Sequence, residues 1–128
     1  MTRELLPRMA DRGIAWIPTF SPVHFQWARP EVAGWSEDTI GNLRRILDSH
    51  LEHVAHAYKA GVEIVVGLDA GSLGVKHGEA LIDELFHFLA AGLPMEEVLR
   101  SATSRPRRLW NISVRKHQEG QPGRAGAL

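Results

Sequence analysis

The feature that most constrains how this chain folds is a pair of short, almost continuously apolar runs. Residues 14–20 read IAWIPTF and residues 62–67 read VEIVVG. Runs of this length without alternation of apolar and polar residues are typical of strands that are buried on both faces of a parallel sheet. We therefore predict two parallel strands over these two runs.

A long amphipathic segment separates the two runs. Ser36 is a good helix cap and Gly61 is a good helix stop, and the residues between them carry one apolar stripe. The members of that stripe recur at steps of three and four: Ile40, Leu43, Ile46, Leu47, Leu51, Val54 and Tyr58. A strand, a crossover helix and a second strand form a parallel βαβ unit. Two strands are few for a stable sheet, so the pattern predicts an α/β fold of which these residues form a part.

The remaining segments predict shorter helices and one loop. Residues 21–34 hold two prolines and are interpreted as a long surface loop. Before Gly92, a third helix is expected to bury one apolar face, which comprises Leu81, Ile82, Leu85, Phe86 and Leu89. Pro94 is well placed to begin a fourth helix that runs to Ala102, and residues 105–110 are predicted to add one more turn.

Composition limits the classes to which this protein can belong. Its 128 residues suit one domain, and 15 basic side chains balance 15 acidic ones, which argues against nucleic acid or an anionic membrane as a partner. The absence of cysteine excludes disulfides and thiolate metal sites, and it fits a reducing cytoplasm. No apolar run approaches the roughly 18 residues of a membrane-spanning helix. Residues 113–128, which end in a stretch rich in glycine, proline and alanine, are predicted to be a loose tail.

Asp69 follows directly on the second apolar run and is the strongest candidate for chemistry. Ligands collect at the carboxyl ends of parallel strands, and a carboxylate there can hold a metal and accept a proton from metal-bound water. The alternative is that Asp69, which precedes an Ala-Gly-Ser sequence, only shapes a turn. His24 follows the first run, at the same predicted end, and is a candidate to contact a ligand.

Three segments resemble, in both their sequence motifs and their order, segments of one enzyme family. Residues 60–78 read AGVEIVVGLDAGSLGVKHG, residues 13–20 read GIAWIPTF, and residues 89–109 read LAAGLPMEEVLRSATSRPRRL. The segment at 60–78 resembles the eighth strand and following loop of metal-dependent amidohydrolases of the imidazolonepropionase-like and prolidase-like branch, with Leu68 where threonine is usual. Residues 13–20 resemble the family's seventh strand, and residues 89–109 are similar to the helical segment after the barrel. The likeness covers roughly residues 2–112.

The resemblance implies that residues 1–112 are the carboxyl-terminal part of an amidohydrolase, a partial (β/α)8 TIM barrel. Such an enzyme uses a metal, usually zinc, to activate water against a carbon–nitrogen bond. Asp69 would be the metal ligand and the catalytic base. Ser72 would shape the mouth of the site. His77 would contact the substrate, which is an amide, a cyclic amide or a peptide. His24 is expected to contact it because of its position after the first apolar run.

The family's other metal ligands have no counterpart in this sequence. A tetrahedral zinc site needs about four ligands, and the histidines of the family's earlier strands would all precede Met1. We therefore interpret the chain as an enzyme fragment and expect it to be inactive by itself. The alternative is a non-catalytic α/β fragment, which would act through self-association or through small-anion binding by the glycine-rich turn at residues 67–74.

Other histidines and arginines favour structural interpretations. Three histidines recur every third residue of the long helix: His50, His53 and His56. By helical geometry His53 and His56 turn away from the apolar stripe and His50 lies at its margin, so we predict a solvated face. His87 is predicted to be structural. Three arginines cluster at the predicted last turn: Arg105, Arg107 and Arg108. A solvated helix end, favourable beside the carbonyl pole, is the simplest interpretation of that cluster.

Overall fold

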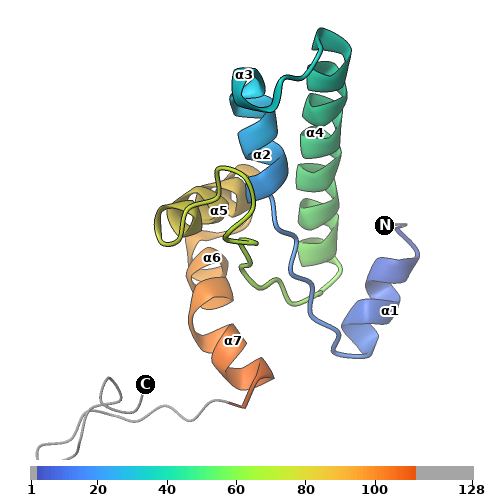
Figure 1. The fold of residues 1–128 in the computed structure, drawn as a ribbon. Helices are drawn as coiled ribbons and strands as arrows, with labels where there is room; N and C mark the ends of the chain where they lie inside the picture. Colours follow the sequence, from blue (N-terminus) through green and yellow to red (C-terminus); the bar gives the residue numbers. More distant parts are fainter. Residues whose placement is uncertain (1–2, 112–128) are drawn as a thin grey trace, which may run out of the picture.

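The structure, a computed structural model, describes residues 3–111, so the tail predicted at 113–128 lies outside the described residues. Helices build most of this part of the chain (Figure 1). Their bounds are α1 (Leu5–Asp11), α2 (Ser21–Ala28), α3 (Pro30–Ala33), α4 (Glu37–Lys59), α5 (Glu79–Ala90), α6 (Met95–Ala102) and α7 (Ser104–Leu109). The long α4 contacts α1, α2 and α5, while α6 and α7 continue from α5 along the other side of the molecule.

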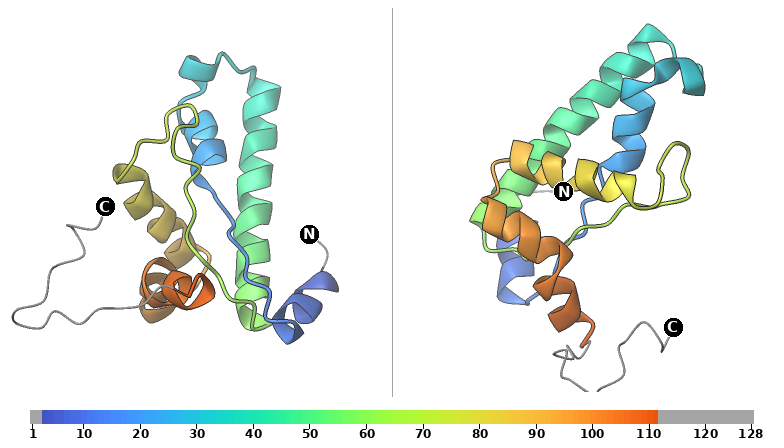
Figure 2. Two further views of the ribbon diagram at one scale, coloured as in Figure 1. Left: turned by 60° about the horizontal axis from the view of Figure 1, so that its bottom comes forward. Right: turned by 90° about the vertical axis from the view of Figure 1, so that its left-hand side faces the viewer.

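The prediction of an α/β fold, a partial (β/α)8 barrel with parallel strands, is wrong. The described residues are 62% helix and 2% strand, with no sheet. The two apolar runs do lie side by side and parallel, but their β-pairing is limited to an isolated bridge between Trp16 and Ile64 (Figure 2). There the N–H of Trp16 donates to the Glu63 carbonyl at 2.8 Å, and the N–H of Val65 donates to the Trp16 carbonyl at 2.9 Å.

The bridge does not extend into strands because the neighbouring backbone groups are missing or engaged elsewhere. Pro18 has no N–H and cannot donate the next bond of a parallel ladder. On the other side of the bridge, the N–H of Ile14 donates to the Met9 carbonyl at 2.9 Å, at the end of α1. Along the far edge of the second run, the N–H of Val66 donates to the Ser101 carbonyl at 3.0 Å. Helices thus flank the paired segments where further strands were expected.

The long helix is confirmed nearly residue for residue. α4 spans Glu37–Lys59, and the Ser36 side chain accepts a hydrogen bond from the N–H of Thr39 at 3.3 Å, as an N-cap should. Gly61 follows the helix with φ of +88°, a left-handed conformation that favours glycine. Among the described residues, no helix is both long and apolar enough to cross a membrane.

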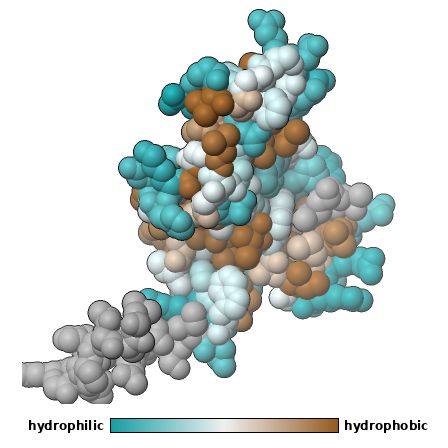
Figure 3. All heavy atoms as spheres, viewed as in Figure 1, coloured by the Kyte–Doolittle hydropathy of each residue, from teal (hydrophilic) through white to brown (hydrophobic). Residues whose placement is uncertain are grey.

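The core forms where α2, α4, α5 and α6 meet the two extended segments. Among its least exposed side chains are Phe20, Val54, Ile64, Phe88 and Val98, each no more than 1% exposed. Not every large apolar residue is covered, and hydrophobic residues reach the surface at several places on the face shown in Figure 3. The core is therefore small, and apolar side chains of the outer helices remain in contact with solvent.

The loop predicted at residues 21–34 is wrong, since this segment forms α2 and α3. Pro22 and Pro30 lie in the first turns of these helices, where the N–H that proline lacks would have no helical partner. The N-terminus of α2 is also bound by a side chain from α5, Glu84, whose geometry is described below. Prolines that suggested a loop thus begin helices.

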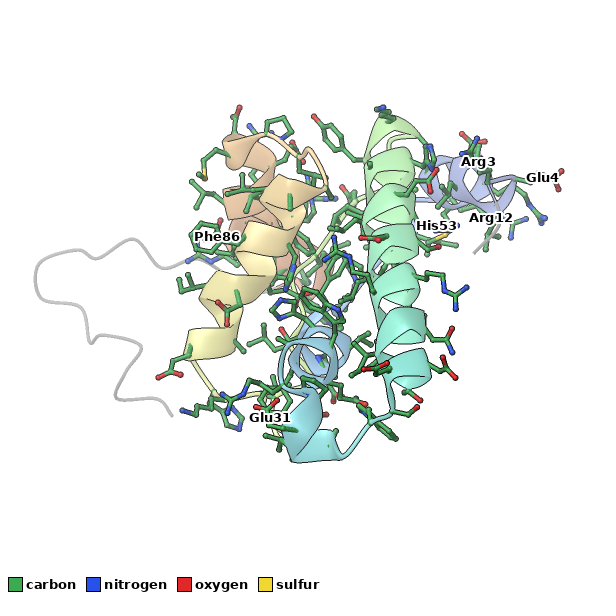
Figure 4. All side chains as sticks on the ribbon, turned by 90° about the horizontal axis from the view of Figure 1, so that it is seen from above. Arg3, Glu4, Arg12, Glu31, His53 and Phe86 are labelled. Carbon is green, nitrogen blue, oxygen red and sulfur yellow. The ribbon has the colours of Figure 1, made fainter. Side chains whose placement is uncertain are left out.

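The face that α5 buries differs from the predicted apolar face. Ile82 is 54% exposed and Phe86 is 61% exposed, whereas Glu84 is fully buried. Ala80 and Phe88, four residues before and after Glu84, are buried with it. Figure 4 shows Phe86 on the side of α5 that is turned away from α4. A polar group with hydrogen-bond partners has therefore displaced apolar side chains from the interior.

The interpretation of the arginine cluster as a solvated helix end is wrong for Arg105. Its side chain is 14% exposed, donates to the Ile64 carbonyl at 3.2 Å and pairs with Glu97 at 2.7 Å. Arg108 forms an ion pair with Glu63. These contacts fasten α7 to the second apolar run, so two of the three arginines position the segment that leads to Asp69.

Candidate functional site

Asp69 lies in an exposed turn at the end of the second apolar run. Its φ is +52°, a left-handed value that aspartate adopts more readily than most residues. The hydroxyl of Ser72 donates to Asp69 Oδ2 at 2.6 Å, and the N–H of Ser72 donates to the Asp69 carbonyl at 3.1 Å. The structure therefore brings Asp69 and Ser72 together, in the turn geometry of the alternative interpretation.

The turn is anchored to α2 through a glycine. A Cβ at Gly74, whose φ is +77°, would lie 2.2 Å from the ring of Phe25. Val75 beside it is buried, and its carbonyl accepts a hydrogen bond from the N–H of Gly71 at 3.2 Å. We call residues 68–78 the Asp69 loop. Its middle is fixed against α2 while the Asp69 carboxylate stays exposed.

The other predicted site residues do not complete a metal centre around Asp69. His77 is exposed in the turn before α5, and His24 belongs to α2, where its ring faces His87. Within residues 3–111, no three side chains among histidine, cysteine, aspartate and glutamate gather closely enough to hold a metal ion. A zinc site needs about four ligands, so the donor set that the described residues offer does not fit zinc.

Three histidines gather instead around Phe20. His50 stacks on the Phe20 ring at 4.1 Å between centroids, and His87 stacks on it at 5.1 Å. His24 meets His87 edge to face at 4.5 Å. The histidine cluster, His24, His50 and His87, joins α2, α4 and α5. The prediction of a solvated face is therefore wrong for His50, which is half-buried.

Burial lowers the pKa of two members of the histidine cluster, His87 and His50. Desolvation is the largest cause and, together with the nearby His24 and His50, it lowers the pKa of His87 to about 4, although Asp83 acts to raise it. Burial also lowers the pKa of His50, with His53 contributing in the same direction. The Nε2 atom of His87 is buried and has no hydrogen-bond partner within the described residues. A buried polar atom without a partner is uncommon in folded proteins and marks a place where a partner is expected.

Glu84 is the polar residue that the sequence interpretation missed. Its Oε1 accepts from the N–H of Phe20 at 2.7 Å, and its Oε2 accepts from the N–H and the hydroxyl of Ser21 at 3.0 and 2.7 Å. Burial raises the pKa of Glu84, and these three hydrogen bonds oppose that rise. The available signal was its spacing of four residues from both Ala80 and Phe88, which places a carboxylate on a buried stripe.

Comparisons with protein-family models, with curated proteins and with solved structures found no match to this chain. The amidohydrolase resemblance accordingly rests on residues 13–20, 60–78 and 89–109 of the sequence alone. The roles expected for Asp69 and His77 remain predictions from that resemblance.

Proposed function

We propose that this chain is the carboxyl-terminal portion of a metal-dependent amidohydrolase that cleaves an amide, a cyclic amide or a peptide, and that it is inactive by itself. Asp69 contributes the carboxylate of that site. The proposal includes the predicted contacts of Ser72, His77 and His24 with substrate. We place the enzyme in the cytoplasm, because a chain of 128 residues without cysteine suits a reducing compartment.

The observation that carries the proposal is the setting of Asp69. Ile64 and Val65, just before it in the chain, are 1% exposed, whereas Asp69 itself is exposed in a left-handed turn. The apolar run that leads to Asp69 lies parallel to the run that leads to Phe20, so both runs point toward the same end of the pair. A carboxylate that emerges at the end of a rigid, buried segment is well placed to serve a site formed with other polypeptide.

The remaining ligands must come from outside residues 3–111. One carboxylate with a neighbouring hydroxyl cannot satisfy the tetrahedral coordination of zinc. What Asp69 can supply is a single anionic oxygen ligand at a fixed position. Under this proposal the metal belongs to the assembled enzyme, whose remaining polypeptide provides histidines.

The direct genetic test is to read the genomic DNA upstream of the codon for Met1 in all three frames. The proposal expects coding sequence for a strand with a histidine-x-histidine motif and for later metal-binding histidines. In the enzyme so encoded, Asp69→Asn should abolish hydrolysis, while Asp11→Asn, at an exposed position in α1, should leave it intact. Unrelated upstream sequence, or full activity of the Asp69→Asn enzyme, would overturn the proposal.

Self-association is the second candidate, favoured by exposed apolar side chains on α5 and α6. Four of them are more than half exposed: Ile82 54%, Phe86 61%, Met95 56% and Leu99 52%. A second copy of the chain is the proposed partner, because association would remove this apolar surface from water. Light scattering across a concentration series should then show dimers or larger species. Phe86→Lys should reduce them and Leu73→Lys, at a loop residue 58% exposed, should not, whereas a monomer throughout would contradict this candidate.

A further inference from the structure

A half-open pocket lies between α2, α4 and α5, apart from the Asp69 loop. Its volume is about 160 Å³. The residues that matter for its chemistry are Phe20, His24, Trp27, Arg44, Asp48 and His87. An engineered apolar cavity of about 150 Å³ binds benzene, so a space of this size suits one six-membered ring.

One residue of the pocket lining carries the partnerless nitrogen, which is itself buried, so a ligand atom reaches it only when a neighbouring side chain moves. His87 lines the pocket, and its buried Nε2 lacks a hydrogen-bond partner within the described residues. A buried imidazole nitrogen that lost its water on folding without gaining another partner is costly, which makes a polar atom from a bound molecule favourable at this position. Because the ring is neutral, Nε2 either donates or accepts, depending on its tautomer.

Aromatic side chains form much of the remaining lining, beside Leu47 and Leu51. Phe20 stacks on His87 at 5.1 Å, and His24 lies 5.8 Å from the Trp27 ring and 4.5 Å from His87. Aromatic side chains attract a further ring in stacked or edge-to-face geometry. These walls therefore favour a flat, unsaturated molecule over a branched aliphatic one.

One ion pair, between Arg44 and Asp48, lies at the rim of the pocket. The Arg44 guanidinium lies 4.9 Å from the centre of the Trp27 ring and pairs with Asp48 at 3.2 Å. Its positive charge is thus already balanced by Asp48 and by the face of an aromatic ring. A neutral ligand fits this rim better than a strongly charged one.

We propose that this pocket is a binding site for a small neutral aromatic molecule that carries a hydroxyl group, with its ring among Phe20, His24 and Trp27 and its hydroxyl on His87 Nε2. A hydroxyl both donates and accepts, so it satisfies either tautomer of the neutral imidazole. The inference uses neither Asp69 nor a metal, and it shares only His24 with the amidohydrolase proposal.

Phenol and toluene are matched probes, because they differ in the hydroxyl and share the ring. Both are titrated into the full chain, with histidine labelled with ¹⁵N and the ring nitrogens of His87 followed by NMR. We expect saturable shifts at His87 with phenol, and a dissociation constant for toluene about fivefold higher, as the loss of one net hydrogen bond implies. His87→Phe should remove the difference between the probes.

Two further variants locate the site. Leu51→Trp places a larger side chain in the pocket lining and should abolish binding of both probes. His53→Gln is the matched control: His53 lies on the side of α4 that faces α1 (Figure 4), and both dissociation constants should stay unchanged. If His87→Phe fails to fold, the phenol–toluene comparison in the native chain and the Leu51→Trp variant still test the proposal. Equal binding of the two probes, or no saturable shift at His87 because only water occupies the pocket, would overturn the proposal.

Discussion

Two acidic regions of this protein differ in what surrounds them. In the Asp69 loop, the carboxylate is exposed and its hydrogen-bonded partner is the hydroxyl of Ser72, three residues away. On α5, Glu84 is fully buried and accepts three hydrogen bonds from Phe20 and Ser21, more than sixty residues away in sequence. One carboxylate thus closes a local turn, and the other joins distant parts of the fold.

The difference separates a structural acid from an acid that is free for chemistry. All the hydrogen bonds of Glu84 go to the first residues of α2, so its removal would leave buried donors without acceptors. Asp69 holds no distant element in place. A residue that contributes little to stability yet lies exposed at the end of a buried segment is a better candidate for binding than for folding.

Replacing the two acids should give the largest contrast. Glu84→Ala leaves the N–H groups of Phe20 and Ser21 without their acceptor, and we expect it to lower the free energy of unfolding by about 3 kcal/mol. Asp69→Ala removes an exposed hydrogen bond and places alanine in a left-handed conformation, so it should cost about 1 kcal/mol. Urea denaturation followed by circular dichroism measures both values. Equal losses for the two variants would show that both acids contribute alike to stability, and would contradict this distinction.

The attachment of the Asp69 loop should depend on Gly74. Gly74→Ala forces a left-handed residue with a Cβ into contact with the Phe25 ring, and we expect a loss of about 2 kcal/mol. Gly71→Ala is the matched control, because its φ is also positive, at +106°, but no atom lies within 4 Å of the added Cβ. Strain alone should cost the control about 1 kcal/mol. If the two variants lose the same stability, the Phe25 contact does not hold the loop.

Acid should weaken the buried region through His87. Its folded pKa, about 4, lies below the ordinary value of 6.5, so the unfolded chain takes up this proton first. The stability that neutral His87 contributes is present above pH 6.5 and is lost as the pH falls toward 4. Because the side chain is only partly buried, we expect a loss of about 1–2 kcal/mol, well below the full value of the shift.

The measurement is the free energy of unfolding of the native chain and of His87→Phe between pH 7.5 and 4.5. The variant should lose less stability than the native chain. Glu84 works in the opposite direction, since its raised pKa makes the folded state bind a proton more readily and so lowers stability as the pH rises above 4.5. His24, His50 and Asp83 face His87 and are present in both proteins, so the difference isolates His87. Parallel pH profiles would contradict this role.

Local signals in the sequence predicted α4, α5 and α6 well, although they missed α2 and α3. Ser36 caps the start of α4 with its side chain, and Pro94, whose φ is fixed, directly precedes α6. The apolar stripe of α4 was also a sound guide, since Leu47 and Val54 are buried. These features need no knowledge of distant contacts, which is why the sequence alone could predict them.

Features that depend on distant partners were not predictable in the same way. The two apolar runs are apolar enough for strands, yet Pro18 lacks the N–H for a second ladder bond and helices occupy the flanks. The burial of Glu84 was not predicted, because its hydrogen-bond donors lie at the N-terminus of α2, far away in the sequence. Likewise, nothing near His50 in the sequence indicates that it stacks on Phe20, thirty residues earlier.

The central claim, that Asp69 can act on a metal only with ligands from outside residues 3–111, is tested most directly by zinc stoichiometry. Native mass spectrometry and calorimetric titration of the purified chain with zinc, beside Asp69→Asn, would measure it. The account predicts no stoichiometric tight binding and no difference between the two proteins. One tightly bound zinc per chain, lost in Asp69→Asn, would contradict it.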